Sequence, residues 1–275
     1  MWTLSGFADE IDPDLKTQCA TLNDLGITHV EFRSAWGTNV LDLTDEQIEE
    51  TAKTLAAHDL KVSSIGSPLG KINIEDDFDA HLVRADRALA VARRLGAPFI
   101  RIFSFFLPPD QTPEQHRDEV LRRMAALTER AAPSGVVLLH ENEKEIYGDT
   151  PERVLDIVES IGSPALRLAW DPANYVQVGV IPFTDGYALL RPYTDYIQIK
   201  DALLATGEVV PAGEGDGQVR ETVRALAADG FAGFFSMEPH LGSVNAFGAL
   251  SGAANFTRAT RAFTAILDSE GIAYS

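Results

Sequence analysis

Short apolar runs alternate with helical segments along the whole chain, and this alternation restricts the fold more than any other feature. The runs cover residues 2–8, 27–33, 60–66, 98–106, 135–141, 166–171, 196–200 and 234–238. Strand-like runs that alternate with helices predict a parallel sheet. Eight such units predict a (β/α)8 TIM barrel, here as a single domain over residues 1–275. An open doubly wound sheet is less consistent with the sequence, because ADEIDPD (8–14) after the first run is no glycine-rich phosphate loop.

Three of the segments between the runs carry boundary signals of helices. Residues 43–59 contain Thr44 near their start, and threonine is a residue type that caps helix N-termini through its hydroxyl group. Residues 81–96 end on Gly96, which can adopt the left-handed conformation that terminates a helix. Residues 150–162 open on Thr-Pro and end on glycine. These segments are predicted to be helices.

The charge of the chain restricts its partners. With 23 basic and 41 acidic residues the formal charge is 23 − 41 = −18. Such a surface repels phosphate backbones and anionic membranes, so we expect no nucleic acid and no membrane as partner. Cys19 is the only cysteine, so no intramolecular disulfide can form. Without an apolar segment of about 18 residues or a secretory signal at the N-terminus, a cytoplasmic protein is expected.

Polar residues end four consecutive runs of the predicted barrel. The fifth run ends in Glu141, the sixth in Asp171, the seventh carries Gln198, and the eighth ends in Glu238. Active sites of this fold lie at the carboxyl ends of the strands. Facing carboxylates repel one another unless they are protonated or neutralised, and an all-oxygen set suits Mn2+ or Mg2+. The sequence therefore favours a divalent metal site over a solvated rim of acids.

Seven short motifs together resemble the sugar phosphate isomerase/epimerase superfamily. They are ADEI, VEFR, HENEKEIYGD, WDPANYVQVG, IQIKDA, VPAGEGDG and MEPHL, and the resemblance extends over residues 4–242. This superfamily of xylose-isomerase-like barrels includes ketose 3-epimerases, hydroxypyruvate isomerases, inosose dehydratases and type IV apurinic endonucleases. Its motifs identify the superfamily and not a substrate.

The resemblance implies a metal site and a mechanism. Glu141, Asp171 and Glu238 match metal ligands of the family, whereas Gln198 stands where the family usually has histidine. One divalent ion is implied, with Mn2+ expected and Mg2+ or Co2+ as alternatives. Glu141 and Glu238 match the two bases that exchange a proton beside a carbonyl, through a metal-stabilised enediolate.

Further residues are candidates for catalysis or substrate binding. We assign substrate contacts to His240, Lys200, Asn174, Glu143 and Trp36. His140 is a third candidate catalytic residue. Alternation along a regular strand would pack it behind the barrel, and a twist at the strand end would bring it into the pocket as acid or base. Residues 204–218 contain no lysine or arginine, which disfavours a phosphorylated substrate.

These observations lead to one expected function and three rivals. We expect an isomerase or epimerase of a small carbohydrate, a keto sugar or keto-polyol. The first rival is a lyase that works by β-elimination, either an inosose-type dehydratase or a subunit that cleaves 3-keto-glycosides or C-glycosides with a small second subunit. An abasic-site nuclease would need a histidine-rich three-metal cluster and a basic face. A non-catalytic sugar-binding barrel is disfavoured because both candidate bases are present. A homo-oligomer is an open alternative.

Overall fold

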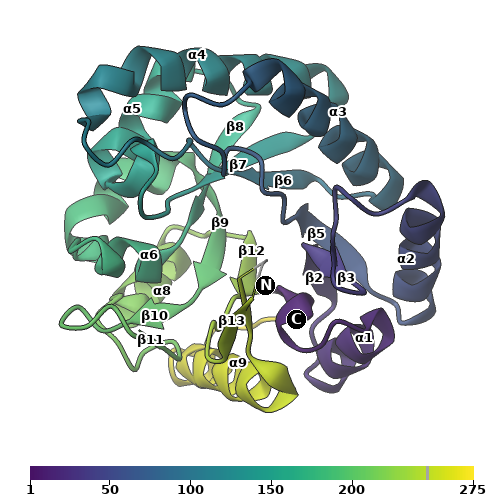
Figure 1. Ribbon diagram of the computed structural model, residues 1–275. Helices are drawn as coiled ribbons and strands as arrows, with labels where there is room; N and C mark the ends of the chain where they lie inside the picture. The colour runs from purple at the N-terminus through teal and green to yellow at the C-terminus, as the bar shows by residue number, and fades with distance from the viewer. Residues whose placement is uncertain (246–247) are drawn as a thin grey trace.

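Eight parallel strands form a nearly closed barrel with helices around it in the computed structural model, which describes residues 1–245 and 248–275 (Figure 1). The strands are β1 (Thr3–Gly6), β2 (His29–Phe32), β5 (Lys61–Ile65), β6 (Phe99–Ile102), β7 (Val137–Glu141), β8 (Leu166–Trp170), β9 (Thr194–Ile199) and β12 (Phe234–Met237). Each overlaps one of the eight apolar runs, which confirms the predicted single-domain (β/α)8 barrel.

Helices and small hairpins connect the strands. The helices are α1 (Leu15–Asp24), α2 (Asp45–Ala57), α3 (Phe78–Leu95), α4 (Pro113–Ala131), α5 (Pro151–Ile161), α6 (Pro172–Gln177), α7 (Ala188–Leu190), α8 (Val219–Ala228) and α9 (Gly252–Ser269). The hairpins pair β3 (Ser34–Ala35) with β4 (Thr38–Asn39), β10 (Asp201–Ala202) with β11 (Val209–Val210), and β13 (Ser243–Asn245) with β14 (Gly248–Leu250). Within the described ranges, no helix combines the length and the hydropathy needed to cross a membrane.

The predicted helix boundaries are largely confirmed. Thr44 caps α2 by accepting a hydrogen bond from the Gln47 backbone at 3.2 Å. Gly96 ends α3 with a φ of +69°, a conformation that glycine adopts without strain. The predicted start of α3 is wrong by three residues, because Asp77 caps the helix through the Asp79 backbone N–H (2.9 Å) and α3 begins at Phe78.

The hydrogen-bonded ladder of the barrel has one gap. The strand order is β1-β12-β9-β8-β7-β6-β5-β2, and no strand pairing joins β1 to β2 among residues 1–245 and 248–275. Side chains bridge this gap at the carboxyl ends of the two strands. Arg33 Nε lies 2.8 Å from Asp9 Oδ2, and the Ser34 hydroxyl donates to the same oxygen at 2.8 Å.

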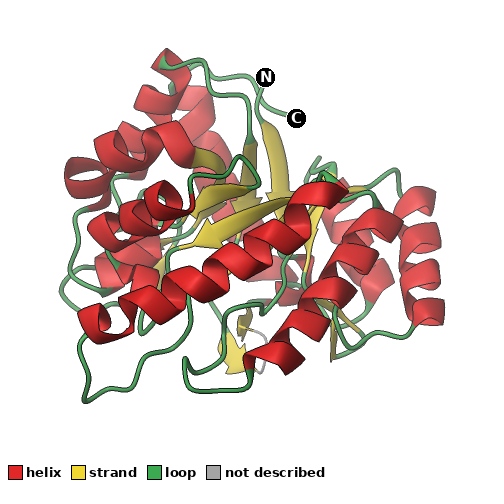
Figure 2. Ribbon diagram, turned by 90° about the horizontal axis from the view of Figure 1, so that it is seen from above, coloured by secondary structure: helices red, strands yellow, loops and turns green. Residues whose placement is uncertain are grey.

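The chain termini lie together at the opposite end of the barrel. Trp2 and Tyr274 form a parallel bridge, and the Leu4 N–H donates to the Ser275 carbonyl at 2.8 Å. Figure 2 shows both termini at one end of the molecule and the β13–β14 hairpin at the other. The carboxyl ends of the strands are therefore surrounded by connecting loops and not by the chain ends.

A buried histidine supports the loop between β5 and α3. His81 Nε2 accepts a hydrogen bond from the Gly70 backbone N–H at 2.9 Å, and its ring packs against Phe78 and Phe105. Burial, together with the nearby positive charges, lowers its pKa to about 4. The folded protein therefore holds this ring neutral, since only the neutral ring has a lone pair that can accept the Gly70 N–H.

We predict a loss of stability in mild acid that depends on His81. Between pH 6.5 and pH 4 the unfolded chain binds a proton at this position that the folded chain does not, so the free energy of unfolding falls as the pH falls. The loss is at most about 2 kcal/mol after allowance for partial solvent screening. Urea unfolding of the wild type and of His81→Gln at pH 7.0 and 4.5 measures it, with His116→Gln on α4 as control. An equally steep pH dependence in His81→Gln would contradict the assignment.

Candidate active site

Inward side chains of the strands form two stacked layers inside the barrel. The lower layer is mostly apolar and contains Phe99, Leu139, Ala169, Tyr196 and Phe234. Two residues further along the same strands stand Arg101, Glu141, Asp171, Gln198 and Ser236. Because alternate residues of a strand point to the same side, the polar residues lie directly above the apolar layer. The barrel thus places a charged layer at its carboxyl end.

Three carboxylates from three different strands converge in the charged layer. Glu141, Asp171 and Glu238 each contribute an oxygen atom, and these oxygens lie within 4.8 Å of one another. The three residues are 1%, 0% and 2% exposed, respectively. Asp171 also caps α6 by accepting the Asn174 backbone N–H at 2.9 Å, which fixes its orientation. The structure therefore brings together three of the four predicted metal-binding residues.

The fourth predicted ligand, Gln198, presents its oxygen without a hydrogen bond. Its Nε2 donates to Glu31 Oε2 at 3.0 Å, and Oε1 has no hydrogen-bond partner within the described residues. The side chain is fully buried. Buried amide oxygens are seldom unpaired in folded proteins, so this atom is available as an acceptor or metal ligand. Together with the carboxylates, the donor set consists of oxygen only and fits a hard divalent cation.

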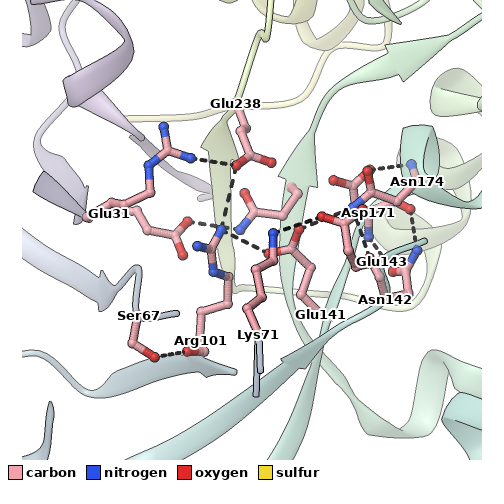
Figure 3. A network of polar contacts seen from close by, with 12 residues as sticks. Glu31, Ser67, Lys71, Arg101, Glu141, Asn142, Glu143, Asp171, Asn174 and Glu238 are labelled. Carbon is pink, nitrogen blue, oxygen red and sulfur yellow. Dashed lines mark hydrogen bonds and ion pairs between the residues drawn. The ribbon is translucent and has the colours of Figure 1, made fainter. Parts of the chain in front are cut away.

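Two buried basic groups neutralise part of the carboxylate cluster. Lys200 Nζ lies 2.8 Å from Asp171 Oδ2 and 3.0 Å from Glu238 Oε2. Arg101 Nη1 lies 3.2 Å from Glu141 Oε2 and 3.6 Å from Glu238 Oε1. Figure 3 shows Arg101 directed at both glutamates. Lys200, which was predicted from the sequence to contact substrate, therefore pairs with two acids of the cluster.

Negative charge exceeds positive charge in this part of the barrel. Among the described residues around the cluster, the buried carboxylates are Asp9, Glu10, Glu31, Glu141, Asp171 and Glu238, and the buried cations are Arg33, Arg101 and Lys200. With all groups ionised the excess is 6 − 3 = 3 negative charges. Uncompensated charges are costly in a dry interior, so carboxylates must bind protons or a further cation.

The surroundings separate the pKa values of the two candidate bases. Burial raises the pKa of Glu141 to about 8, although Arg101 opposes this shift. Burial acts in the same direction on Glu238, but Lys200 and His240 outweigh it and hold the pKa of Glu238 well below its usual range. Near neutral pH the cluster thus contains one protonated and one ionised glutamate.

A second group of acids adjoins Glu238 on the other side. His240 Nε2 lies 3.3 Å from Glu10 Oε1 and 3.4 Å from Glu238 Oε1. Glu10 is buried, which raises its pKa to about 8, and it accepts hydrogen bonds from the His240 backbone (2.9 Å) and the Ser251 hydroxyl (2.6 Å). The side chain of His240 is 26% exposed. His240 therefore lies between solvent and the buried Glu238.

The remaining predicted substrate-binding residues lie at different depths. The Asn174 side-chain amide donates to Glu141 Oε1 at 3.3 Å, so it supports a candidate base. Glu143 pairs with Lys71 at 3.0 Å (Figure 3). Trp36 is 37% exposed in the β3–β4 hairpin.

His140 lies on the other side of β7 from Glu141. Its ring is fully buried beside Ser104 and Gly148, and a side chain at Gly148 would overlap with it. Burial lowers its pKa to about 3, and neither ring nitrogen has a hydrogen-bond partner in the part of the chain that the structure describes. The strand remains regular here, so the structure does not bring the predicted catalytic His140 into the cluster. Its position is that of the packing alternative.

Sequence reasoning missed Arg101 and Lys71. Arg101 stands inside the apolar run PFIRIFSFF (98–106), and a cation in such a run is a signal of a buried ion pair. Its guanidinium group lies between the rings of Phe7 (4.7 Å) and Phe103 (4.8 Å). Lys71 lies in a connecting loop, where the sequence offers no comparable signal.

Asp201 fixes the glycine-rich loop that follows β11. Its carboxylate accepts backbone N–H groups of Gly213 (2.9 Å), Gly215 (3.1 Å) and Gly217 (2.7 Å). A side chain at Gly215 would overlap with this carboxylate, which explains the glycine. The motif VPAGEGDG thus folds around Asp201. Because Asp201 follows Lys200 directly, the loop is fixed next to the end of β9.

Comparisons with known proteins agree with this architecture. The family model described as xylose isomerase-like TIM barrel matches residues 19–260. A 2-epi-5-epi-valiolone 7-phosphate 2-epimerase from Actinoplanes sp. is 33% identical over 142 residues, which are 51% of this chain and 50% of the relative. A 3-dehydroshikimate dehydratase from Bacillus anthracis is 22% identical over 169 residues, 60% of each protein. The chain thus covers 50% and 60% of the lengths of these two relatives.

A solved structure shares the fold over nearly the full chain. It is a xylose isomerase-like TIM barrel protein from Mycobacterium smegmatis in complex with magnesium, with a TM-score of 0.69 and 22% identity. The match covers 97% of either chain. At this identity the likeness establishes a common fold.

We predict that Gly148 and His140 are energetically coupled. Gly148→Ala drives a methyl group into the imidazole ring and lowers the free energy of unfolding by about 1–3 kcal/mol. His140→Ala removes the ring, so the loss in the double variant is smaller than the sum of the single losses. Urea unfolding of the four proteins measures the coupling. Gly148→Ala combined with His58→Ala, on the distant end of α2, serves as the additive control, and additivity of the His140 pair would contradict this location of the ring.

Proposed function

The chain belongs to the xylose isomerase-like TIM barrel family, and from this premise we propose that it is a divalent-metal-dependent isomerase or epimerase of a keto sugar or keto-polyol. The observation that carries the proposal is the convergence of Glu141, Asp171 and Glu238, with one oxygen of each within 4.8 Å of the others. Buried carboxylates that converge and outnumber the cations around them provide both a cation site and proton carriers.

The residues at the cluster fit the metal that the proposal requires. The ligands would be Glu141, Asp171, Gln198 and Glu238. The unpaired Gln198 oxygen and the excess of buried negative charge both favour a hard divalent cation, with Mn2+ expected and Mg2+ or Co2+ as alternatives. When bound, the ion would supply a Lewis acid that polarises a carbonyl oxygen.

Glu141 and Glu238 are the proposed proton carriers. Glu238 is stabilised as the carboxylate by Arg33 (3.1 Å) and Lys200 (3.0 Å), so it can accept a proton from a carbon next to a carbonyl group. Glu141 is held by a hydrogen bond from Asn174 and by Arg101, and it is the proposed group that delivers a proton to the opposite face. Transfer between two faces of one carbon inverts its configuration, which is an epimerisation.

The proposed substrate is a small uncharged carbohydrate. Among the described residues, Arg33, Arg101 and Lys200 each lie within 3.2 Å of a carboxylate, and the excess charge of the site is negative. None of these three cations is therefore left unpaired to bind an anionic substrate group. The half-exposed His240, the Glu143–Lys71 pair and Trp36 are proposed to contact the substrate at the entrance.

A dehydratase that works by β-elimination is the second candidate. Elimination begins with the same proton abstraction but needs an acid for the departing hydroxyl group. His240, at 3.4 Å from Glu238 and 3.3 Å from Glu10, is the group that favours this reaction, and one relative is a dehydratase. If the elimination instead cleaves a 3-keto-glycoside or C-glycoside, a small second subunit is a candidate partner, and a homo-oligomer is a candidate for either reaction.

We predict that an experiment in deuterated water distinguishes the roles of Glu141 and Glu238. Purified protein with MnCl2 is incubated in D2O with a panel of keto sugars and keto-polyols, and mass spectrometry and NMR follow deuterium and product. Glu141→Gln and Glu238→Gln each slow epimer formation by about 10²–10⁴-fold. Glu141→Gln retains deuterium uptake into recovered substrate, because Glu238 still removes the proton.

The control and the contradicting outcomes are defined by the same assay. Glu49→Gln, on α2 and paired with Arg94 far from the cluster, keeps the wild-type rate. An unsaturated product without deuterated epimer would replace the first candidate by the dehydratase. Absence of both exchange and product with Mn2+, Mg2+ and Co2+ across the panel would contradict both.

A further inference from the structure

Lys200 is the cation that bridges two of the proposed metal ligands. Its ammonium group lies 2.8 Å from Asp171 Oδ2 and 3.0 Å from Glu238 Oε2, and its side chain is only 3% exposed. Both carboxylates lie within ion-pair distance, so this ammonium group is paired with them in the metal-free protein. One positive charge therefore already lies between two carboxylates that the proposed function assigns to a metal.

An ammonium group and a divalent ion compete for the same oxygen atoms here. Asp171 Oδ1 is occupied by the Asn174 backbone N–H, which leaves Oδ2 as the oxygen for a further cation. Glu238 Oε1 faces Arg33 at 3.1 Å, which leaves Oε2. These two remaining oxygens are the ones that Lys200 contacts. A hard divalent ion binds carboxylate oxygens at about 2.0–2.6 Å, and two cations so close would repel each other strongly.

Of the three buried cations, Lys200 is the one that can leave. Arg101 is held between the rings of Phe7 and Phe103, and Arg33 stacks on Phe7 at 4.4 Å while it pairs with Asp9. Within the described residues, the contacts of the Lys200 ammonium group are those with Asp171 and Glu238. Its long flexible side chain can therefore move without disturbing an aromatic stack.

We propose that Lys200 is the resident counterion of the metal-free site and that metal loading displaces its ammonium group from Asp171 and Glu238. The inference rests on the metal site of the proposed function. Glu141 and Glu143 are the other carboxylates near this ammonium group, and the Glu143 side chain, which follows β7, is 16% exposed. The displaced ammonium group thus turns toward Glu143, where a substrate oxygen can accept its hydrogen bond.

Two consequences distinguish this role from simple structural pairing. The metal-free protein keeps its site assembled, because Lys200 already offsets part of the charge. The same group lowers the apparent metal affinity, because the metal must displace it. Removal of the ammonium group therefore lowers the thermal stability of the metal-free protein and raises its affinity for the metal. These are two opposite effects of one substitution.

We predict both effects for Lys200→Met. Isothermal titration of EDTA-treated protein with MnCl2 gives a Kd at least tenfold lower than that of the wild type. Thermal unfolding without metal gives a Tm several degrees below that of the wild type, and added Mn2+ restores it, since the ion then neutralises the carboxylates. Lys53→Met is the matched control, because Lys53 is an exposed lysine on α2, and its Mn2+ affinity equals that of the wild type.

Other outcomes overturn the inference in recognisable ways. A Kd for Lys200→Met that is unchanged or higher, with Mn2+ still bound by the wild type, overturns the counterion role and leaves the proposed metal site in place. Failure of the wild type and of Lys200→Met to bind Mn2+, Mg2+ or Co2+ overturns the metal site as well. Lys200→Gln is measured in parallel, and loss of folding in both variants that Mn2+ does not restore also overturns the inference.

Discussion

An excess of buried negative charge at the carboxyl end of the barrel is the constraint on which the rest of the site depends. Water cannot screen these carboxylates, and the buried cations Arg33, Arg101 and Lys200 offset part of their charge. Arg33 and Arg101 are positioned by the ring of Phe7, which lies 4.4 Å and 4.7 Å from their guanidinium carbons. Glu238 takes most of this positive charge and Glu141 takes less, and the two glutamates therefore differ in proton affinity although they lie close together.

The charged layer depends in turn on the apolar layer beneath it. Phe99, Tyr196 and Phe234 pack against one another with ring centroids 5.7–6.2 Å apart, and they close the barrel below the carboxylates. Such packing excludes water from the lower face of the site and keeps the strands in register. The period of two along each strand then determines which side chains reach the site and explains why Glu141 enters it while His140 does not.

The sequence predicted the features that depend on local order. Strand positions followed from apolar runs, and the residues at the tips of these strands, such as Asp171 and Glu238, indeed come together. Features that depend on distant partners were not predictable. Arg101 meets Glu141 from 40 residues away, and the Gln198 amide is oriented by Glu31, 167 residues earlier in the chain. The start of α3 was missed because one aspartate cap outweighed the apolar periodicity on which its prediction was based.

The gap in the strand ladder has a mechanical consequence. Arg33 joins the tips of β1 and β2 through Asp9, and the same guanidinium group holds Glu238. Within the described part of the chain no strand pairing holds β1 to β2, so side-chain contacts such as Arg33–Asp9 carry this connection. Closure of the barrel and the position of Glu238 thus depend on one side chain, and a substitution of Arg33 would disturb both.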